Sequence, residues 1–151
     1  WGGKIHWAGG QGHATPAVHI LPDDGNDVVA VNLSAAWRLI RGFDPLLRQA
    51  TAGRAVFVTD TVARVPVAYW GALGATKAGM ENLVRCWAAE TEKTPLRINL
   101  FDPGVVRTRM RGAAFPGENP VSLAGPERVS TALAAMCLPD EARHGALVAV
   151  Q

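Results

Sequence analysis

The stretch Ala55-Val56-Phe57-Val58-Thr59 is β-branched or aromatic almost throughout and shows no alternation of polar and apolar residues. A strand with this pattern is buried on both faces, as the strands of parallel sheets are. Similar short apolar runs lie at 4–7, 96–101 and 146–150, and apolar residues spaced by three and four predict helices at about 28–49, 70–92 and 127–138. The β-α-β-α-β-α-β order predicts an α/β fold in which about four parallel strands form a doubly wound sheet with helices on both faces.

The composition is that of an ordinary globular domain, since 48% of the 151 residues are apolar and 19% are charged. The formal charge of +2 comes from basic residues spread along the chain, which indicates neither a nucleic acid nor a membrane surface as partner. Cys86 and Cys137 lie far apart, and no Cys/His spacing suits zinc, so we expect reduced thiols, no metal and a cytoplasmic location.

No apolar stretch approaches the ~18 residues of a membrane span. The chain does not begin with Met, which leaves open that it is truncated, processed or partly known.

Several short motifs follow one another along the chain: Trp7-Ala8-Gly9, Val31-Asn32-Leu33, the strand from Gly53 to Asp60, Ala75-Thr76-Lys77-Ala78, Asn99, and Pro103-Gly104-Val105-Val106-Arg107-Thr108. In this order and at these spacings the chain resembles the C-terminal, nicotinamide-side part of the classical short-chain dehydrogenase/reductase family. The pieces match, in turn, the family's Asn-Ala-Gly turn, its helix asparagine, its serine-bearing strand, the end of its Tyr-x-x-x-Lys motif, the residue before the next turn, and its Pro-Gly-x-x-x-Thr motif. The resemblance implies a Rossmann-like fold, NAD or NADP as cofactor, and an oxidoreductase that acts on an alcohol or ketone.

The resemblance also assigns roles to the matching residues. Lys77 would bind the nicotinamide ribose and lower the pKa of a neighbouring proton donor by its charge. Asn32 would kink its helix and hold a water of the proton relay, although an amide that satisfies local backbone groups is the alternative. The cofactor would contact Ala8, Gly9, Lys77, Pro103, Gly104, Val106 and Thr108.

Three residues depart from the family pattern at positions that the chemistry needs. Leu73, four residues before Lys77, stands where the family has its catalytic tyrosine, and leucine carries no proton. Asp60 stands where the family has a serine, and an ionised carboxylate would oppose the oxyanion of carbonyl reduction. Trp7 replaces the asparagine of the Asn-Ala-Gly turn. Losing a general acid costs ~10² to 10⁴ in rate and losing an oxyanion donor ~10² to 10³. Tyr69 is a substitute donor if the helix extends to it, and Asp60 is an alternative ion-pair partner for Lys77.

The glycine-rich phosphate-binding turn of the family is not found, so we expect residues 1–151 to be a single partial domain without the N-terminal glycine-rich βαβ unit. The segment Gly9-Gly10-Gln11-Gly12 is interpreted as a loop, because no helix follows it directly. The strand at 4–7 would then have a bare edge, open to another copy or partner. The helices at 28–49 and 70–92 are candidates for a homo-oligomer interface, with burial inside one subunit as the alternative. The Gly/Pro-rich stretch from Arg111 to Pro126 predicts a mobile loop, and substrate choice would rest on 109–126.

Three interpretations follow. The chain is part of an NAD(P)-dependent oxidoreductase, or it is a non-catalytic relative that serves as a binding or assembly subunit. In the third interpretation the letters at Trp7, Asp60 and Leu73 are misread, which an intact mass would reveal.

Overall fold

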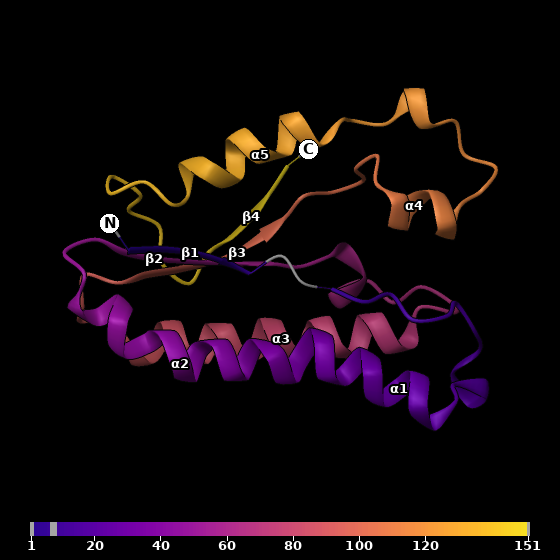
Figure 1. Ribbon diagram of the computed structural model, residues 1–151, viewed down its shortest axis with the longest axis horizontal. Coiled ribbons are helices and arrows are strands. Elements are labelled where there is room, and N and C mark those ends of the chain that lie inside the picture. The colour runs from indigo at the N-terminus through magenta and orange to yellow at the C-terminus, as the bar shows by residue number, and fades with distance from the viewer. Residues whose placement is uncertain (1, 7–8, 151) are drawn as a thin grey trace.

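Figure 1 shows the computed structural model of the chain, which describes residues 2–6 and 9–150. The four strands pair in the order β1-β2-β3-β4, and every pairing is parallel. The strands are β1 (Gly2–His6), β2 (Gly53–Val58), β3 (Arg97–Asp102) and β4 (Leu147–Ala149). The α-helices are α1 (Pro22–Val29), α2 (Ala35–Gln49), α3 (Gly71–Glu90), α4 (Arg109–Ala114) and α5 (Pro126–Ala135). A π-helical turn, η2 (Ala30–Ser34), joins α1 to α2, and short 3-10 turns are η1 (Ala17–His19), η3 (Thr61–Ala63) and η4 (Pro120–Ser122).

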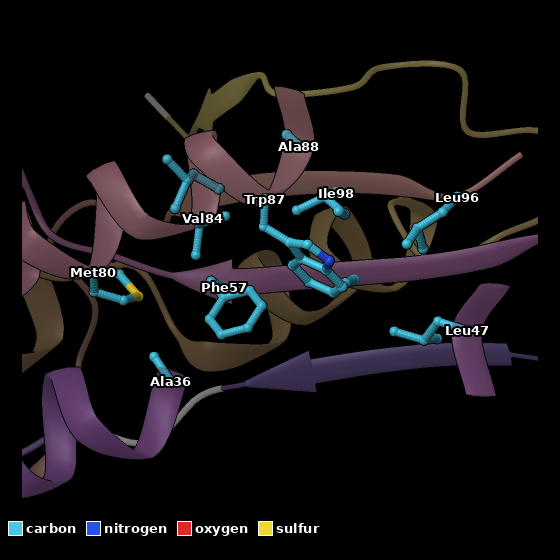
Figure 2. Close-up of a cluster of buried hydrophobic side chains, with 11 residues drawn as sticks. Ala36, Leu47, Phe57, Met80, Val84, Trp87, Ala88, Leu96 and Ile98 are labelled. Carbon is cyan, nitrogen blue, oxygen red and sulfur yellow. The ribbon is translucent and has the colours of Figure 1, made fainter. Parts of the chain in front are cut away.

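Helices cover both faces of the sheet, which confirms the predicted Rossmann-like α/β class. Helices α1, α2 and α3 lie on one face, and α5 lies on the other (Figure 1). Each face has its own core. Figure 2 shows the core between the sheet and the α2–α3 layer, where Phe57 of β2 and Ile98 of β3 meet Met80 and Trp87 of α3. The second core joins Val56 and Phe101 to α5.

The central strand β2 is buried at all six residues, as its sequence predicts. Its first residue, Gly53, lies so close to the end of α2 that a Cβ there would be 2.3 Å from the carbonyl oxygen of Leu47. Only glycine fits, and this contact fixes where α2 ends relative to the sheet.

Several element boundaries differ from the predicted ones. The helix expected from residue 28 begins at Pro22, because proline suits the first helical turn and Gly25 does not interrupt it. The helix expected from residue 70 begins at Gly71. The Gly/Pro-rich stretch contains α4 and η4 rather than irregular loop alone. The last strand is shorter than predicted and only half-buried, since it pairs with β3 alone among the described strands.

The first strand lies at an edge of the sheet and pairs only with β2 among the described residues. The segment Gly9-Gly10-Gln11-Gly12 contains no helix, so its interpretation as a loop is confirmed. Because all strands are parallel, the segments after β1, β2 and β3 meet at one end of the sheet, where α4 also lies (Figure 1).

Candidate active site

Two adjoining cavities lie where the strands end. The smaller one has a volume of about 160 Å³ and is bordered by Gly9, the end of β2, and the turn after β3. The larger one has a volume of about 300 Å³ and extends toward α4 and the start of α3. Both cavities share a wall formed by Asp60, Leu73, Thr108 and Met110.

Lys77 borders the smaller cavity and is only 6% exposed. Its ammonium group donates a hydrogen bond to the carbonyl oxygen of Val58 at 2.9 Å. Burial lowers the pKa of Lys77 below its ordinary value, and the negative charges of Asp60 and Glu81 oppose that shift. The side chain is therefore not a helix-surface lysine: it places a proton-bearing group inside the cavity.

Asn32 is fully buried at the centre of the π-helical turn η2. Its Oδ1 accepts a hydrogen bond from the amide of Gly10 at 2.8 Å, and its Nδ2 donates to the carbonyl of Gly10 and to Oγ1 of Thr76. A Cβ on Gly9 would lie 3.7 Å from Asn32 Oδ1 and 3.3 Å from Lys77 Nζ. The amide thus ties the loop after β1 to α3, beside the lysine.

Asp60 caps the turn η3, because its Oδ1 accepts a hydrogen bond from the amide of Val62 at 2.9 Å. Among the described residues, none donates a hydrogen bond to its Oδ2 or forms an ion pair with it. Lys77 donates to Val58 and forms no direct ion pair with Asp60 among the described residues, so the suggested salt bridge is wrong, although the charge of Asp60 still favours the protonated lysine from a longer distance. Leu73 is 4% exposed and fills the wall between the two cavities with an apolar side chain.

The turn after β3 is shaped by Gly104, whose φ of 65° lies in the left-handed region that favours glycine. Asp102 accepts a hydrogen bond from the Gly104 amide and fixes this turn. Val106 pairs with Ala124 through a single β-bridge, and Thr108 caps α4 by accepting from the amide of Arg111. The backbone on this side of the cavity is therefore held by three successive contacts, at Gly104, Val106 and Thr108.

Hydroxyl groups close to the site are largely engaged elsewhere. Thr59 donates to Glu81 and Thr61 donates to Asp102. Tyr69 precedes α3 instead of lying within it, and its side chain is 60% exposed and borders neither cavity. The idea that Tyr69 replaces the missing tyrosine depended on a longer helix and is wrong for this structure.

A family model for the short chain dehydrogenases matches residues 5–119. The chain belongs to the short chain dehydrogenase family.

Relatives in this family agree with that assignment. The uncharacterized oxidoreductase YciK of Escherichia coli (strain K12) is 38% identical over 124 residues, which cover 82% of this chain and 49% of YciK. A short chain dehydrogenase of Escherichia coli CFT073, solved in complex with NADPH, has a TM-score of 0.91 at 34% identity and matches 99% of this chain and 62% of its own. One from Pseudomonas syringae has a TM-score of 0.94 at 33% identity, with the same coverage. The chain spans about half the length of the curated relatives it matches.

The short chain dehydrogenase motifs predicted from the sequence come together in space. Gly9, Asp60, Leu73, Lys77, Pro103, Val106 and Thr108 border the smaller cavity, and Gly104 borders the larger one. Asn32, in η2, lies behind this wall and connects the loop after β1 to α3. Trp7 and Ala8 lie outside the described residues. The roles that the resemblance gives to these residues stay predictions.

Sequence reasoning missed a buried charged cluster beside the site. Arg64 bridges Glu81 of α3 and Asp102 of β3, and both carboxylates are almost fully buried. Arg85 also pairs with Glu81 at 2.9 Å. The sequence contained one indication of this cluster. Glu81 lies four residues after Lys77, so helix geometry places both charged side chains on the same face.

Sequence reasoning also missed most walls of the larger cavity. The Trp70 and Phe115 rings stack at 5.7 Å with 18° between their planes, and the Arg111 guanidinium lies 3.7 Å from the Phe115 centroid. Arg111 is also held by Glu118 through bonds of 2.6 and 2.8 Å. These contacts connect the start of α3 to α4 and give the larger cavity an aromatic side.

None of the helices that the structure describes combines the length and the apolar character needed to cross a bilayer. Within residues 2–6 and 9–150, His, Cys, Asp and Glu side chains form no cluster of three or more that could hold a metal ion.

Proposed function

We propose that this chain forms the nicotinamide side of an NAD(P)-dependent oxidoreductase. The observation that carries the proposal is the buried ammonium of Lys77 in the same cavity as Gly9, Pro103 and Thr108. The solved relative from Escherichia coli CFT073 was complexed with NADPH, and it matches nearly all of this chain.

The described residues fit a nicotinamide group. Gly9 leaves space that a side chain would fill, since a Cβ there would lie 3.3 Å from Lys77 Nζ. The ammonium of Lys77 is a donor suited to ribose hydroxyls. The Thr108 hydroxyl and the Val106 backbone offer polar groups for the carboxamide on the opposite side. A bound nicotinamide cofactor supplies or accepts hydride here.

The same proposal assigns the remaining roles. Asn32 orients the loop after β1 and is placed to hold a water near Lys77. In this proposal a glycine-rich unit holds the adenosine half and the pyrophosphate, and residues 2–6 and 9–150 do not include that unit. A cytoplasmic location is part of the proposal and rests on the two free thiols, Cys86 and Cys137.

The substrate class implied by the resemblance is an alcohol or ketone. Reduction of a ketone needs a proton for the oxygen, and the side chain at Leu73 has none. Asp60 adds a negative charge to the wall where the oxyanion would form. We therefore expect slow turnover of simple ketones, below that of a site with tyrosine and serine by ~10² or more.

Cofactor binding tests the proposal directly. NADPH and NADH are titrated into the full-length protein, with the melting temperature and cofactor fluorescence as readouts. Lys77→Met should weaken binding by about tenfold or more, the loss of a hydrogen bond to a charged group. Lys93→Met is the matched control, because Lys93 lies in the exposed turn after α3. Absence of binding by either cofactor would contradict the proposal.

A non-catalytic binding or assembly subunit is the second candidate, favoured by Leu73. The double change Leu73→Tyr and Asp60→Ser separates the two. If the site is otherwise intact, the variant gains ketone reduction. A variant that binds the cofactor and remains inactive with a panel of ketones would favour the subunit.

The proposal includes a homo-oligomer. Trp37 and Leu46, both on α2, are large apolar side chains that are 49% and 62% exposed. Trp87 of α3, in contrast, is buried in the core of one subunit. The interface is therefore proposed on α2 first, and the contribution of α3 is secondary. The edge of β1 is a second surface open to pairing.

A further inference from the structure

The site combines a carboxylate, Asp60, with an apolar side chain, Leu73, at the position where the family has its tyrosine proton donor. Asp60 borders both cavities, and within residues 2–6 and 9–150 its Oδ1 accepts a hydrogen bond from the Val62 amide while its Oδ2 accepts none. Leu73, next to it in the shared wall, cannot donate a proton. This pair of features disfavours a substrate that becomes an anion, and it suits a substrate that carries positive charge.

Asp60 is the one carboxylate that lines the larger cavity among the described residues, and the charges of Lys77 and Arg111 act on it without a direct ion pair. Arg111 is neutralised by Glu118 through two hydrogen bonds. Lys77 borders the smaller cavity and not the larger one, and its ammonium is directed to the Val58 carbonyl. The remaining wall is mostly apolar, with Val62, Val67, Trp70 and Phe115. In such surroundings a carboxylate attracts a cation more strongly than it would in water.

On the aromatic side of the cavity, Trp70 is the ring available to a cationic ligand, and tryptophan is the side chain that attracts cations best. Phe115 already has the Arg111 guanidinium 3.7 Å from its centroid. Trp70 stacks on the same ring and also borders the cavity.

We infer that the site takes an apolar iminium ion, or the corresponding amine in the reverse direction, in place of a ketone or alcohol. This inference rests on the proposed function. Hydride from a reduced nicotinamide adds to the iminium carbon, and the electron pair of the C=N bond moves to nitrogen, which becomes a neutral amine. The nicotinamide is oxidised, and no proton is consumed. Asp60 stabilises the cationic substrate, and Leu73 is tolerated because the step needs no proton donor.

The binding test compares two ligands of the same bicyclic size, the N-methyl-dihydroisoquinolinium cation and the neutral ketone tetralone. Calorimetry on the full-length protein should show the cation binding more tightly by about tenfold or more. Asp60→Asn keeps the oxygen that accepts from Val62 but removes the charge, so it should bring the two affinities close together. Asp140→Asn, at an exposed residue, is the control and should leave the difference unchanged. Equal binding of both ligands by the unmodified protein would overturn the inference.

The turnover test uses the same two compounds with NADPH and NADH, and each rate is divided by that of the reaction without protein. The acceleration should be larger for the iminium ion by ~10² or more, the contribution of a general acid that only the ketone requires. Leu73→Tyr with Asp60→Ser should reverse this preference. Cofactor binding is measured first, so that failure of the proposed function can be told from failure of the iminium inference. If neither cofactor binds, the proposed function is contradicted. If a cofactor binds but the acceleration is equal for both compounds or greater for tetralone, the iminium inference alone is overturned.

Discussion

His6 is the last residue of β1 and is buried with its Nε2 lacking a hydrogen-bond partner among the described residues. Its ring packs against Phe57 at 5.3 Å. Burial lowers the pKa of His6 below its ordinary value of 6.5, and the charges of Lys77 and Lys4 lower it further. The folded protein therefore keeps His6 neutral at a pH where the unfolded chain takes up a proton.

This predicts a loss of stability in mild acid. Above pH 6.5 His6 is neutral in both the folded and the unfolded chain, so the free energy of unfolding is not reduced by its burial as a neutral group. As the pH falls from 6.5 through the lowered pKa, the unfolded chain takes up a proton on His6 first, and the free energy of unfolding decreases. His6→Phe should reduce the pH dependence of the free energy of unfolding, measured by urea denaturation across this window. His19→Phe, at an exposed histidine, should not. The same pH dependence in both variants would contradict the prediction.

Asn32→Ala should destabilise the fold. The change removes three hydrogen bonds and leaves the amide and carbonyl of Gly10 without their partner. The expected loss in the free energy of unfolding is about 1–3 kcal/mol. Asn26→Ala, at an exposed position of α1, should change it by less than about 0.5 kcal/mol. Chemical denaturation of both variants checks the difference, and a loss as small as that of the control would refute a structural role for the amide.

At the residue scale, sequence motifs predicted which side chains gather at the site, but not their partners. The family resemblance assigns Lys77 and Asp60 to one site. The sequence did not show that Lys77 would choose the Val58 carbonyl over Asp60, because that choice depends on the direction of a long side chain inside a cavity. The prediction of Tyr69 as a substitute proton donor was wrong because the helix begins at Gly71, and residue propensities do not define a helix boundary to within one or two residues.

At the scale of helices and strands, ion pairs fix the position of the turn after β2. Arg64 reaches from this turn to both Glu81 of α3 and Asp102 at the end of β3. Asp60 and the Pro103-Gly104 turn adjoin these anchors, so Arg64 fixes two walls of the cavity at once.

Arg64→Met should therefore cost stability. The change leaves two buried carboxylates without their shared cation, and the expected loss is about 3–5 kcal/mol. Arg85→Met removes a more exposed partner of the same Glu81 and should cost about 0–1 kcal/mol. Thermal and chemical denaturation of the pair check this. Equal losses in the two variants would show that Arg64 is no more than a surface partner.

At the element scale, the four strands and the three long helices were predictable because their apolar periodicity is set by burial. The start of the first helix was missed, since Gly25, Asn26 and Asp27 weaken the apolar pattern while Pro22 supplies the start. The short helix α4 was missed because glycine and proline dominate its surroundings, and it depends on the Thr108 cap and on contacts with Trp70 through Phe115.

For the whole molecule, the two sides of the sheet differ. The α1–α3 layer is broad, whereas α5 alone covers much of the other face (Figure 1). The exposed Trp37 and Leu46 lie on the broad layer. If α2 forms the interface of a homo-oligomer, Trp37→Glu with Leu46→Lys should lower the mass measured by analytical ultracentrifugation. A protein of unchanged mass would exclude this face as the interface. Val121→Lys, at an exposed apolar residue in η4, is the control.

The overall topology was predictable from the order of strands and helices, because parallel strands need crossovers and crossovers have one hand. What the sequence did not reveal was the division of the site into two cavities. That division arises where Leu73, Asp60 and Met110 converge from α3, the turn after β2 and α4, and it depends on packing between segments far apart in the chain.

The widened turn at Ala30–Ser34 has a consequence for how this protein tolerates changes in length. A π-helical turn accommodates one residue more than the regular helix around it. The wide turn absorbs this residue, so deleting Ala30 should restore a regular helix and leave Val28 facing the interior. A deletion within α2, where no wide turn absorbs the change, would rotate one part of the helix by about 100° relative to the other. A single-codon deletion should thus be accepted at this turn and not along α2.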